Sequence, residues 1–420
     1  MIEERRLKTV ARFSYGESLP GDSRVPGIFP VMGSNGRVGS HSKANTQGPT
    51  IVVGRKGSFG KVRYVPDSAF VIDTAYFLDG RSVQSNLKWL YYVLTSAQLD
   101  TISRDTGVPG LSRELAHNVR IPYCGEAGQA LIVRYLDHAE LRIARAIQAK
   151  SALVQLLRER KSSVETQLLF GGGRTAPSKS WFGLGAPGWQ QLPARALFEE
   201  VIERNSVDLP MLSVTISKGV ILQSEYMKSA SSKKDQSRSD RSQYKVAQPG
   251  DIVYNKMRAW QGAAGVSHHR GIVSPAYVVM RPRPGVNSSY FGSVMRSPQF
   301  AREAERWSYG ITSDMWSLRP QHFKSIRFLV PSPDEQASIV WQLSSGTVEI
   351  DRAIDAAEHE IQLLREYRTR LIADVVTGKK DVHAEAAGLP DVDPLELTQV
   401  LSGASVIEDD VEEEVSADAD

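Results

Sequence analysis

The sequence lacks several features that whole classes of protein require. Its 420 residues contain a single cysteine, Cys124, so neither an internal disulfide nor a thiolate metal cage can form. No run approaches about 18 uninterrupted apolar residues, which argues against a membrane-spanning helix. The charged start of the chain is not followed by the apolar segment of a secretory signal. We therefore expect a soluble protein of the reducing cytoplasm, with no membrane partner.

Assembled catalytic motifs are also missing. There is no His-Glu-x-x-His zinc motif, no nucleophile elbow and no set of protein-kinase motifs. The glycine-rich segment 54–62 departs from a phosphate-binding loop because Arg55 stands where the first glycine belongs. Ser274-Pro-Ala-Tyr277 lacks the second proline of the amino-methyltransferase motif. These absences favour a binding protein over an enzyme.

What the chain does have is an uneven distribution of charge. Hydrophobic residues make up 41% and charged residues 24%, as in ordinary globular proteins. Residues 381–420 hold 13 of the 48 acidic residues and no Lys or Arg, so the first 380 residues carry 51 basic against 35 acidic side chains. A basic body with an acidic tail suggests a polyanionic partner, although a solvated basic surface beside a disordered tail explains the charge equally well.

An internal repeat organises the chain. Residues 129–166 and 336–373, 207 positions apart, are identical at 15 of 38 positions without a gap. The repeat continues more weakly upstream, where residues 71–78 align with 272–279 at an offset of 201. Both upstream segments contain short β-branched and aromatic runs separated by Gly and Pro, which predict strands.

The repeated segments themselves predict two long helices. Neither contains proline, and apolar residues recur at spacings of three and four, with Lys150, Lys161 and Arg368 interrupting the pattern. We expect the two helices to pair, although each could instead lie separately on a globular core. The sequence thus predicts an α+β fold, in which two mixed α/β domains are joined by two long helices forming an antiparallel coiled coil with a pseudo-two-fold internal repeat. The expected segments are domain 1–122, helix 123–170, flexible linker 171–188, domain 189–332, helix 333–378 and an acidic, disordered tail 379–420.

Residues suited to contacting DNA occur in loops of both halves. Lys and Arg neutralise phosphate, whereas Arg, Asn and Gln can read base edges bidentately. Each loop taken singly could be an ordinary solvated loop, but their occurrence in both halves of a basic, duplicated chain favours DNA. The candidate DNA-binding residues are Ser34, Asn35, Arg37, Arg55, Lys56, Lys233, Lys234, Arg238, Arg241, Lys256, Arg258 and Gln261. No metal-binding cluster is expected.

Several motifs resemble those of a known family. Phe29–Gly39, Pro49–Gly60, Asp73–Tyr76, Gly107–Ser112 and Tyr244–Arg258 resemble target-recognition domains of type I restriction-modification specificity subunits. Pro331-Ser-Pro-Asp-Glu-Gln336 is similar to that family's start of a spacer helix. Cys124–Gln129 departs from the same motif, since it lacks the second proline and the adjacent Glu-Gln. The resemblance covers about residues 7–378 in matching order.

The resemblance implies a non-catalytic subunit that selects DNA sequence for a methyltransferase and endonuclease. It implies two recognition domains, each reading half of a split site in double-stranded DNA. The expected partners are two modification (methyltransferase) subunits and restriction (endonuclease/translocase) subunits. This chain is expected to bind no cofactor, with S-adenosylmethionine, Mg²⁺ and ATP held by those partners. The alternatives are a DNA methyltransferase with degenerate motifs and a coiled-coil scaffold that binds only proteins.

Overall fold

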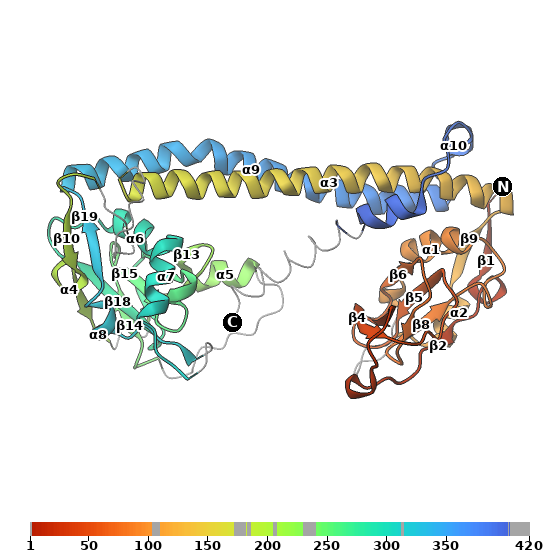
Figure 1. Ribbon diagram of the computed structural model, residues 1–420, viewed down its shortest axis with the longest axis horizontal. Helices are drawn as coiled ribbons and strands as arrows, with labels where there is room; N and C mark the ends of the chain where they lie inside the picture. Colours follow the sequence, from red (N-terminus) through yellow and green to blue (C-terminus); the bar gives the residue numbers. More distant parts are fainter. Residues whose placement is uncertain are drawn as a thin grey trace. The chain divides into compact units, whose positions relative to one another are not determined.

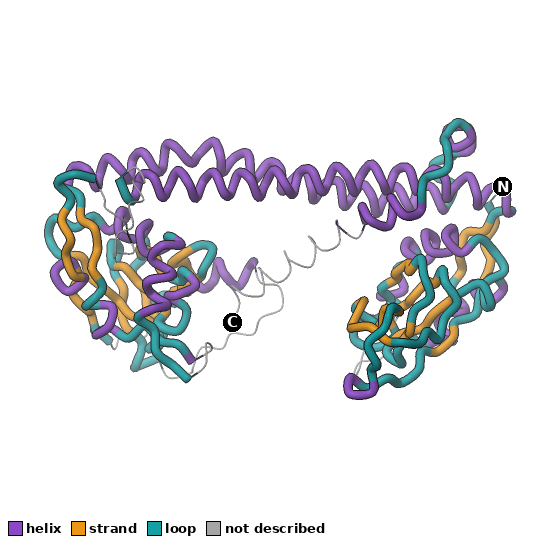
Figure 2. The backbone as a smooth tube through the Cα atoms, viewed as in Figure 1, coloured by secondary structure: helices purple, strands orange, loops and turns teal. Residues whose placement is uncertain are grey.

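The computed structural model describes residues 2–102, 110–171, 182, 186–204, 208–229, 241–311, 315–401 and 403 (Figures 1 and 2). The chain divides into two compact units. Unit 1 comprises Met1–Ser151 and Glu358–Ile407, and unit 2 comprises Ala152–Ala357 and Glu408–Asp420. Each unit therefore contains one strand-rich segment and one half of each long helix, whereas the six expected segments had treated the helices as separate.

Unit 1 begins with a strand that pairs with the strand leading into the first long helix. Its core sheet is antiparallel, in the order β2-β8-β5-β6, beside a three-stranded sheet β4-β3-β7 and the pair β1-β9. The strands are β1 (Glu3–Arg6), β2 (Ser14–Tyr15), β3 (Phe29–Gly33), β4 (Gly36–His41), β5 (Thr50–Gly54), β6 (Val62–Val65), β7 (Phe70–Val71), β8 (Ala75–Leu78) and β9 (Arg120–Tyr123). The short helices are η1 (Leu7–Thr9), η2 (Gly21–Ser23), α1 (Leu87–Ser96), η3 (Leu99–Thr101), α2 (Arg113–Asn118) and α10 (His383–Ala387).

Unit 2 repeats the core sheet as β11-β18-β15-β16 and the strand pair as β10-β19, and adds two pairs, β12-β13 and β14-β17. The strands are β10 (Gln190–Pro193), β11 (Phe198–Val201), β12 (Leu212–Thr215), β13 (Gly219–Leu222), β14 (Lys245–Ala247), β15 (Ile252–Asn255), β16 (Ala264–Val266), β17 (Gly271–Val273), β18 (Tyr277–Pro282) and β19 (Arg327–Val330). The short helices are α4 (Ala194–Leu197), α5 (Gln223–Ser229), η4 (Ala259–Gln261), α6 (Ser288–Arg296), α7 (Pro298–Arg306) and α8 (Pro320–Phe323).

The sheet register corrects the sequence alignment of the two halves by one residue. Val53 lies opposite Tyr76 in unit 1, while Tyr254 lies opposite Val278 in unit 2. The central strands keep the offset of 201, but the neighbouring strand is offset by 202. Val278, and not Tyr277, therefore occupies the position of Tyr76. A one-residue shift moves each side chain to the other face of a sheet, so the hydrogen-bonded pairing decides the equivalence.

A buried glutamine ties each long helix to its own unit. Gln129 in α3 (Glu126–Leu169) accepts a hydrogen bond from the backbone N–H of Asn86, and Gln336 in α9 (Pro333–Val376) accepts one from Asn287 (2.9 and 2.8 Å). Each asparagine caps the short helix that follows it, α1 or α6. Both glutamines are at most 1% exposed. Their identity in the two repeats is explained by this paired role.

The long helices run antiparallel in both units, which confirms the expected pairing. In unit 1 Arg368 of α9 donates to both carboxylate oxygens of Glu140 of α3 (2.7–3.0 Å), and Lys150 pairs with Glu360. In unit 2 Lys161 pairs with Asp351 at 2.6 Å. The three polar residues that interrupt the apolar repeat are thus ion-pair partners across the helix pair.

The apolar residues of the helices serve two kinds of core. The seam formed by Val154, Ile354 and Ala357 is a two-helix contact within unit 2. Nearer the helix ends, Leu136 joins the core of unit 1 and Leu343 joins that of unit 2. The helices therefore both pair with each other and lie on globular cores, and the two expected arrangements coexist.

The expectation of a disordered tail is wrong for residues 379–401. In this segment Val382, Ala386 and Leu397 are buried in unit 1. Arg134 of α3 pairs with Asp391 at 2.9 Å, and Arg145 pairs with Glu396. The acidic composition that suggested disorder instead complements basic side chains on α3, and three apolar residues anchor it. Residues 402 and 404–420 lie outside the described part of the chain.

Candidate nucleic-acid interface

Two loops of unit 1 that are distant in sequence meet beside the end of β5. The β3–β4 turn carries Ser34 and Asn35, and the β5–β6 connection spans residues 55–61. The Asn35 side-chain oxygen accepts hydrogen bonds from Ser58 Oγ (3.2 Å) and Lys61 Nζ (3.4 Å). Gly57 has a positive φ of 70°, and a Cβ there would lie 3.8 Å from Ser34 Oγ. The structure thus brings together the two first-half loops that the sequence singled out.

The cations of this hairpin are held by backbone carbonyls. Arg37 Nε donates to the Gly39 carbonyl (3.3 Å), and Arg63 Nη2 donates to the Asn35 carbonyl (2.9 Å). These hydrogen bonds fix the guanidinium groups on the hairpin without neutralising their charge. Among the described residues neither arginine has a carboxylate partner, and such a cation is suited to a phosphate contact.

Arg55 and Lys56 follow β5 at the centre of the core sheet. Both backbone N–H groups donate to the Thr74 carbonyl, at 2.9 and 3.1 Å, and the Arg55 carbonyl accepts from Leu111 N–H at 2.8 Å. Arg55 Nη1 also donates to the Asp73 carbonyl (3.1 Å). The position of Arg55 is therefore determined by hydrogen bonds to two separate backbone segments, at residues 73–74 and at Leu111.

Unit 2 repeats this backbone arrangement at Lys256. Its N–H donates to the Ala276 carbonyl (3.4 Å), and its carbonyl accepts from Leu318 N–H (2.7 Å). Arg258 is half-buried, and Gln261 ends η4 and is exposed beside Gly262, whose φ is 90°. The offset of 201 between the two halves aligns Arg55 with Lys256, and the hydrogen bonding gives this equivalence a structural basis.

The other candidates of the second half lie apart from this arrangement or outside the described residues. Arg241 is half-buried at the start of the segment that leads into β14, where its carbonyl accepts from Tyr244 N–H (3.0 Å). Lys233, Lys234 and Arg238 lie outside the described residues, as do residues 107–109 of a motif in the first half.

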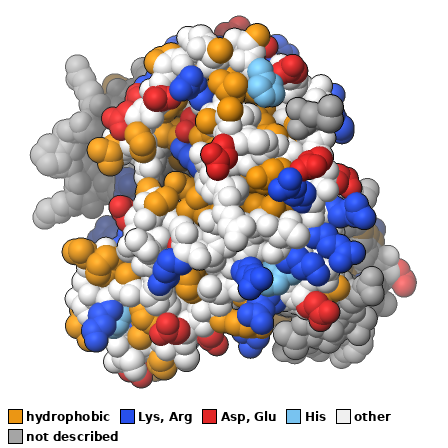
Figure 3. Space-filling view, turned by 90° about the vertical axis from the view of Figure 1, so that its right-hand side faces the viewer, with side chains coloured by type: hydrophobic (Ala, Val, Ile, Leu, Met, Phe, Trp, Pro, Cys, Tyr) orange, Lys and Arg blue, Asp and Glu red, His pale blue; other side chains and the backbone are white. Residues whose placement is uncertain are grey.

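The structure adds residues that the sequence reasoning missed. The guanidinium groups of Arg55 and Arg113 lie 5.0 and 4.7 Å from the centroid of the Tyr15 ring. Burial lowers the pKa of His117, and the neighbouring cations Arg113, Arg12 and Lys8 lower it further. Figure 3 shows Lys and Arg side chains gathered around a histidine in the lower right part of the face of unit 1 that it displays. Only the pairing of distant segments could have revealed that Arg55 and Arg113 meet at Tyr15.

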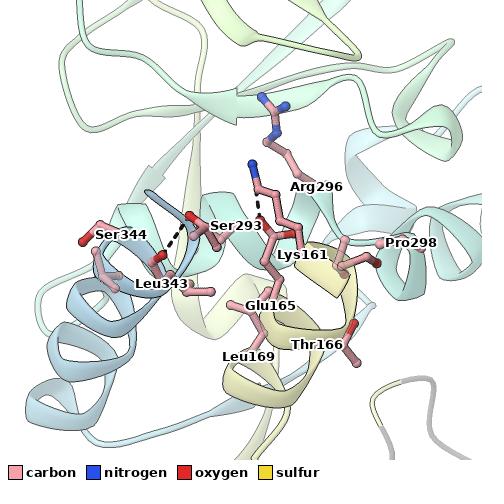
Figure 4. A pocket seen from close by; sticks show the side chains of 13 residues that line it. Lys161, Glu165, Thr166, Leu169, Ser293, Arg296, Pro298, Leu343 and Ser344 are labelled. Carbon is pink, nitrogen blue, oxygen red and sulfur yellow. Dashed lines mark hydrogen bonds and ion pairs between the residues drawn. The ribbon is translucent and has the colours of Figure 1, made fainter. Parts of the chain in front are cut away.

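A cavity of about 430 Å³ in unit 2 has a different character (Figure 4). It is lined by α3, α6 and α9, including Lys161, Glu165 and Arg296. Burial raises the pKa of Glu165, and the positive charge of Lys161 opposes that rise. Since Lys161 is already paired with Asp351, acidic and basic groups balance there. The cavity lacks the cationic excess of the loops in unit 1.

Two other kinds of site are absent from the described residues. No group of three or more His, Cys, Asp or Glu side chains within those ranges is placed to hold a metal ion. No helix in the same ranges combines the length and apolarity needed to cross a membrane.

Comparisons with known proteins identify relatives by structure alone. No protein-family model and no curated protein matches the sequence. Among solved structures, the S subunit of a type I restriction-modification system from M. genitalium matches with 14% identity over 94% of this chain and 97% of that chain, with a TM-score of 0.40. The HsdS subunit from Thermoanaerobacter tengcongensis matches with 14% identity over 90% and 97%, with a TM-score of 0.43.

A third match has the higher TM-score of 0.56. It is a chain from a structure on complex assembly and conformational transition of the type I R-M system, and it is 12% identical over 90% of this chain and 98% of that chain. At this identity the likeness concerns the fold. Over nine tenths of its length, the chain therefore has the fold of a chain from a type I restriction-modification system.

Proposed function

We propose that this protein is the non-catalytic DNA-specificity subunit of a type I restriction-modification complex. Unit 1 and unit 2 each read one half of a two-part site in double-stranded DNA. The paired helices dock two modification subunits, and restriction subunits complete the assembly. S-adenosylmethionine, Mg²⁺ and ATP are bound by those partners.

The observation that carries the proposal is the repetition of one cationic arrangement on a shared fold. A basic residue follows a central strand of each core sheet, Arg55 after β5 and Lys256 after β15, and its backbone is hydrogen-bonded to two neighbouring segments in the same way. A duplicated reader is what a two-part DNA site requires. The fold shared with a type I restriction-modification chain supports the same function.

The alternatives receive less support. A methyltransferase needs a donor-binding loop and a catalytic motif, and the sequence has neither in recognisable form. A scaffold that binds only proteins would give no reason for basic residues at equivalent strand ends of both units.

Reconstitution separates these functions. The purified chain should transfer no methyl group from labelled S-adenosylmethionine to DNA. With its cognate modification subunit it should direct adenine methylation to a two-part sequence, which mapping of methylated sites would identify. Methylation by the chain alone would support the methyltransferase alternative. An assembled complex that methylates without sequence preference would contradict the proposed role.

A further inference from the structure

An exposed aromatic ring stands at the edge of the core sheet of unit 1. β2 is a two-residue strand, and its Tyr15 lies opposite Tyr76 of β8. Tyr15 is 46% exposed and Tyr76 is 2% exposed, and their ring centroids are 5.1 Å apart at an interplanar angle of 60°. Tyr76 is fixed by a hydrogen bond from its hydroxyl to the Leu111 carbonyl (3.0 Å). The exposed ring is therefore supported by a buried, immobilised one.

Two guanidinium groups from separate loops converge on Tyr15. Arg55 follows β5, and Arg113 is the first residue of α2. Both lie within the range of a cation–π contact with the Tyr15 ring, and Arg55 is also 5.8 Å from the centroid of Tyr76. Neither arginine forms an ion pair with a carboxylate in the described ranges of the chain. Two uncompensated cations on one exposed ring favour an anionic partner.

The guanidinium group of Arg55 is held in a defined orientation. Its guanidinium is positioned by the Asp73 carbonyl at Nη1 and by the faces of two tyrosines. A planar guanidinium that is oriented in advance can present its remaining N–H groups as a fork. That fork matches O6 and N7 of guanine in the major groove, the commonest specific contact between a side chain and a base.

We propose that Arg55 reads a guanine in the half-site bound by unit 1, with Tyr15 as the residue that positions its guanidinium plane. Arg113 contacts the adjacent phosphate. This inference rests on the proposed function, and it names one base and one reader within it.

An arginine supported by two tyrosine rings is found at this strand end in unit 1 but not at the equivalent strand end in unit 2. The equivalent strand end carries Lys256, a point charge that cannot form a bidentate fork. Val278 occupies the position of Tyr76, so the supporting ring is absent as well. A defect caused by changing Arg55 should therefore appear in one half-site only.

The test uses the full-length chain assembled with its modification subunit. Methylation rates are measured on duplexes that carry every base at each position of the mapped site, for the wild-type complex and for Arg55→Lys and Arg55→Gln. Both variants should lose discrimination at a single G·C position by about 5- to 150-fold. Discrimination in the other half-site should not change.

Tyr15 is tested by a graded pair of variants. Tyr15→Phe keeps the ring and should retain discrimination, whereas Tyr15→Leu should relax the same single position as the Arg55 variants. A purely structural role for Tyr15 would instead lower the melting temperature and weaken all positions alike.

Arg113→Gln should weaken methylation of every sequence. It should also reduce by about one the slope of the logarithm of the DNA-binding constant against the logarithm of the salt concentration. The matched control is Arg120→Gln, which removes an arginine of the same unit from β9, outside the cluster. It should leave discrimination and salt slope unchanged.

Two results would overturn the inference while leaving the proposed function intact. One is wild-type discrimination at every position by folded Arg55→Lys and Arg55→Gln complexes. The other is a uniform loss on all sequences, the behaviour of a phosphate contact. A wild-type complex with no two-part site would instead contradict the proposed function itself.

Discussion

At the scale of single residues, His117 couples the basic cluster of unit 1 to pH. Its Nε2 accepts a hydrogen bond from Phe13 N–H (3.0 Å), and its ring stacks on the Phe13 ring. The neutral imidazole is therefore the form that fits. Burial, followed by the positive charges of Arg113, Arg12 and Lys8, lowers its pKa.

This lowered pKa predicts the direction of a pH effect on stability. Between the folded pKa and the unfolded value of about 6.5, the unfolded chain binds more protons. The contribution of His117 is therefore fully present above about pH 6.5 and is lost as the pH falls through the folded pKa. The melting temperatures of wild type and His117→Gln should differ most above pH 6.5 and converge below it. A difference that stays constant from pH 8 to pH 5 would show that His117 does not titrate in this way.

The buried pair of Glu140 and Arg368 gives a second prediction. The Glu140 side chain is 3% exposed and that of Arg368 is 30% exposed. Replacing Arg368 by Met leaves a buried carboxylate without this partner. The free energy of unfolding should therefore fall by about 3 kcal/mol, the lower end of the range for breaking a buried pair.

The matched double variant Glu140→Leu/Arg368→Met removes both charges. It should recover most of the loss, because an apolar pair replaces a desolvated ion pair. Chemical denaturation of the wild type, Arg368→Met, Glu140→Leu and the double variant measures the coupling between the two residues. A double variant as unstable as the single one would contradict the explanation.

Sequence reasoning located only part of the candidate site. The loops at residues 34–37 and 55–58 could be predicted because their residue types are suited to DNA contacts. Tyr15 and Arg113 could not, since their approach to Arg55 depends on the pairing of β2 with β8 and on the placement of α2. Contacts between such distant segments leave no local pattern in the sequence.

At the scale of secondary-structure elements, the helices could be predicted and the tail could not. A sustained spacing of three and four residues is a strong signal for a helix, and the partners of its polar interruptions become visible only in the antiparallel pairing. The tail was assigned by composition, and composition does not reveal that Asp391 and Glu396 pair with basic residues of α3. Its few anchors, Val382, Ala386 and Leu397, are spaced too irregularly to form a pattern.

The tail segment 379–401 should stabilise unit 1. It contacts the face of α3 that carries Arg134, His138 and Gln148, and Leu141 on this face is 7% exposed. Leu397→Ala should lower the free energy of unfolding by about 2 kcal/mol. This is the low end of the range for truncating a buried leucine, because a peripheral segment can detach instead of leaving a cavity.

Truncation extends this test. A chain that ends at Lys380 should melt at a lower temperature than wild type. A chain that ends at Gly403 keeps every contact named above and serves as the control. Equal melting temperatures for both truncated chains would show that the tail contributes nothing to unit 1.

At the scale of the whole molecule, α3 and α9 each contribute residues to both units. The division between the units crosses α3 between Ser151 and Ala152, and it crosses α9 between Ala357 and Glu358. The ion pair of Glu140 with Arg368 belongs to unit 1, and that of Lys161 with Asp351 belongs to unit 2. Each of these two ion pairs therefore lies within a single unit.

This division predicts that the helices can be lengthened without disturbing either unit. We consider inserting one heptad after Ser151 and another after Ala357. Seven residues preserve the apolar repeat and add about 10 Å to each helix, or about three base pairs at 3.4 Å per step. Every contact within each unit is retained, so both half-site sequences should be kept.

The complex with the double insertion should lose methylation of the original site and gain it on a site with a longer spacer. Three base pairs also rotate one half-site by about 100° relative to the other, so duplexes with every spacer from the original length to ten additional base pairs should be compared. A single insertion in α3 alone shifts the register between the two helices by seven residues, and it serves as the control for disrupted pairing. Continued methylation at the original spacing by a folded double-insertion protein would show that the helices do not set the distance between half-sites. Their role would then be limited to docking the modification subunits.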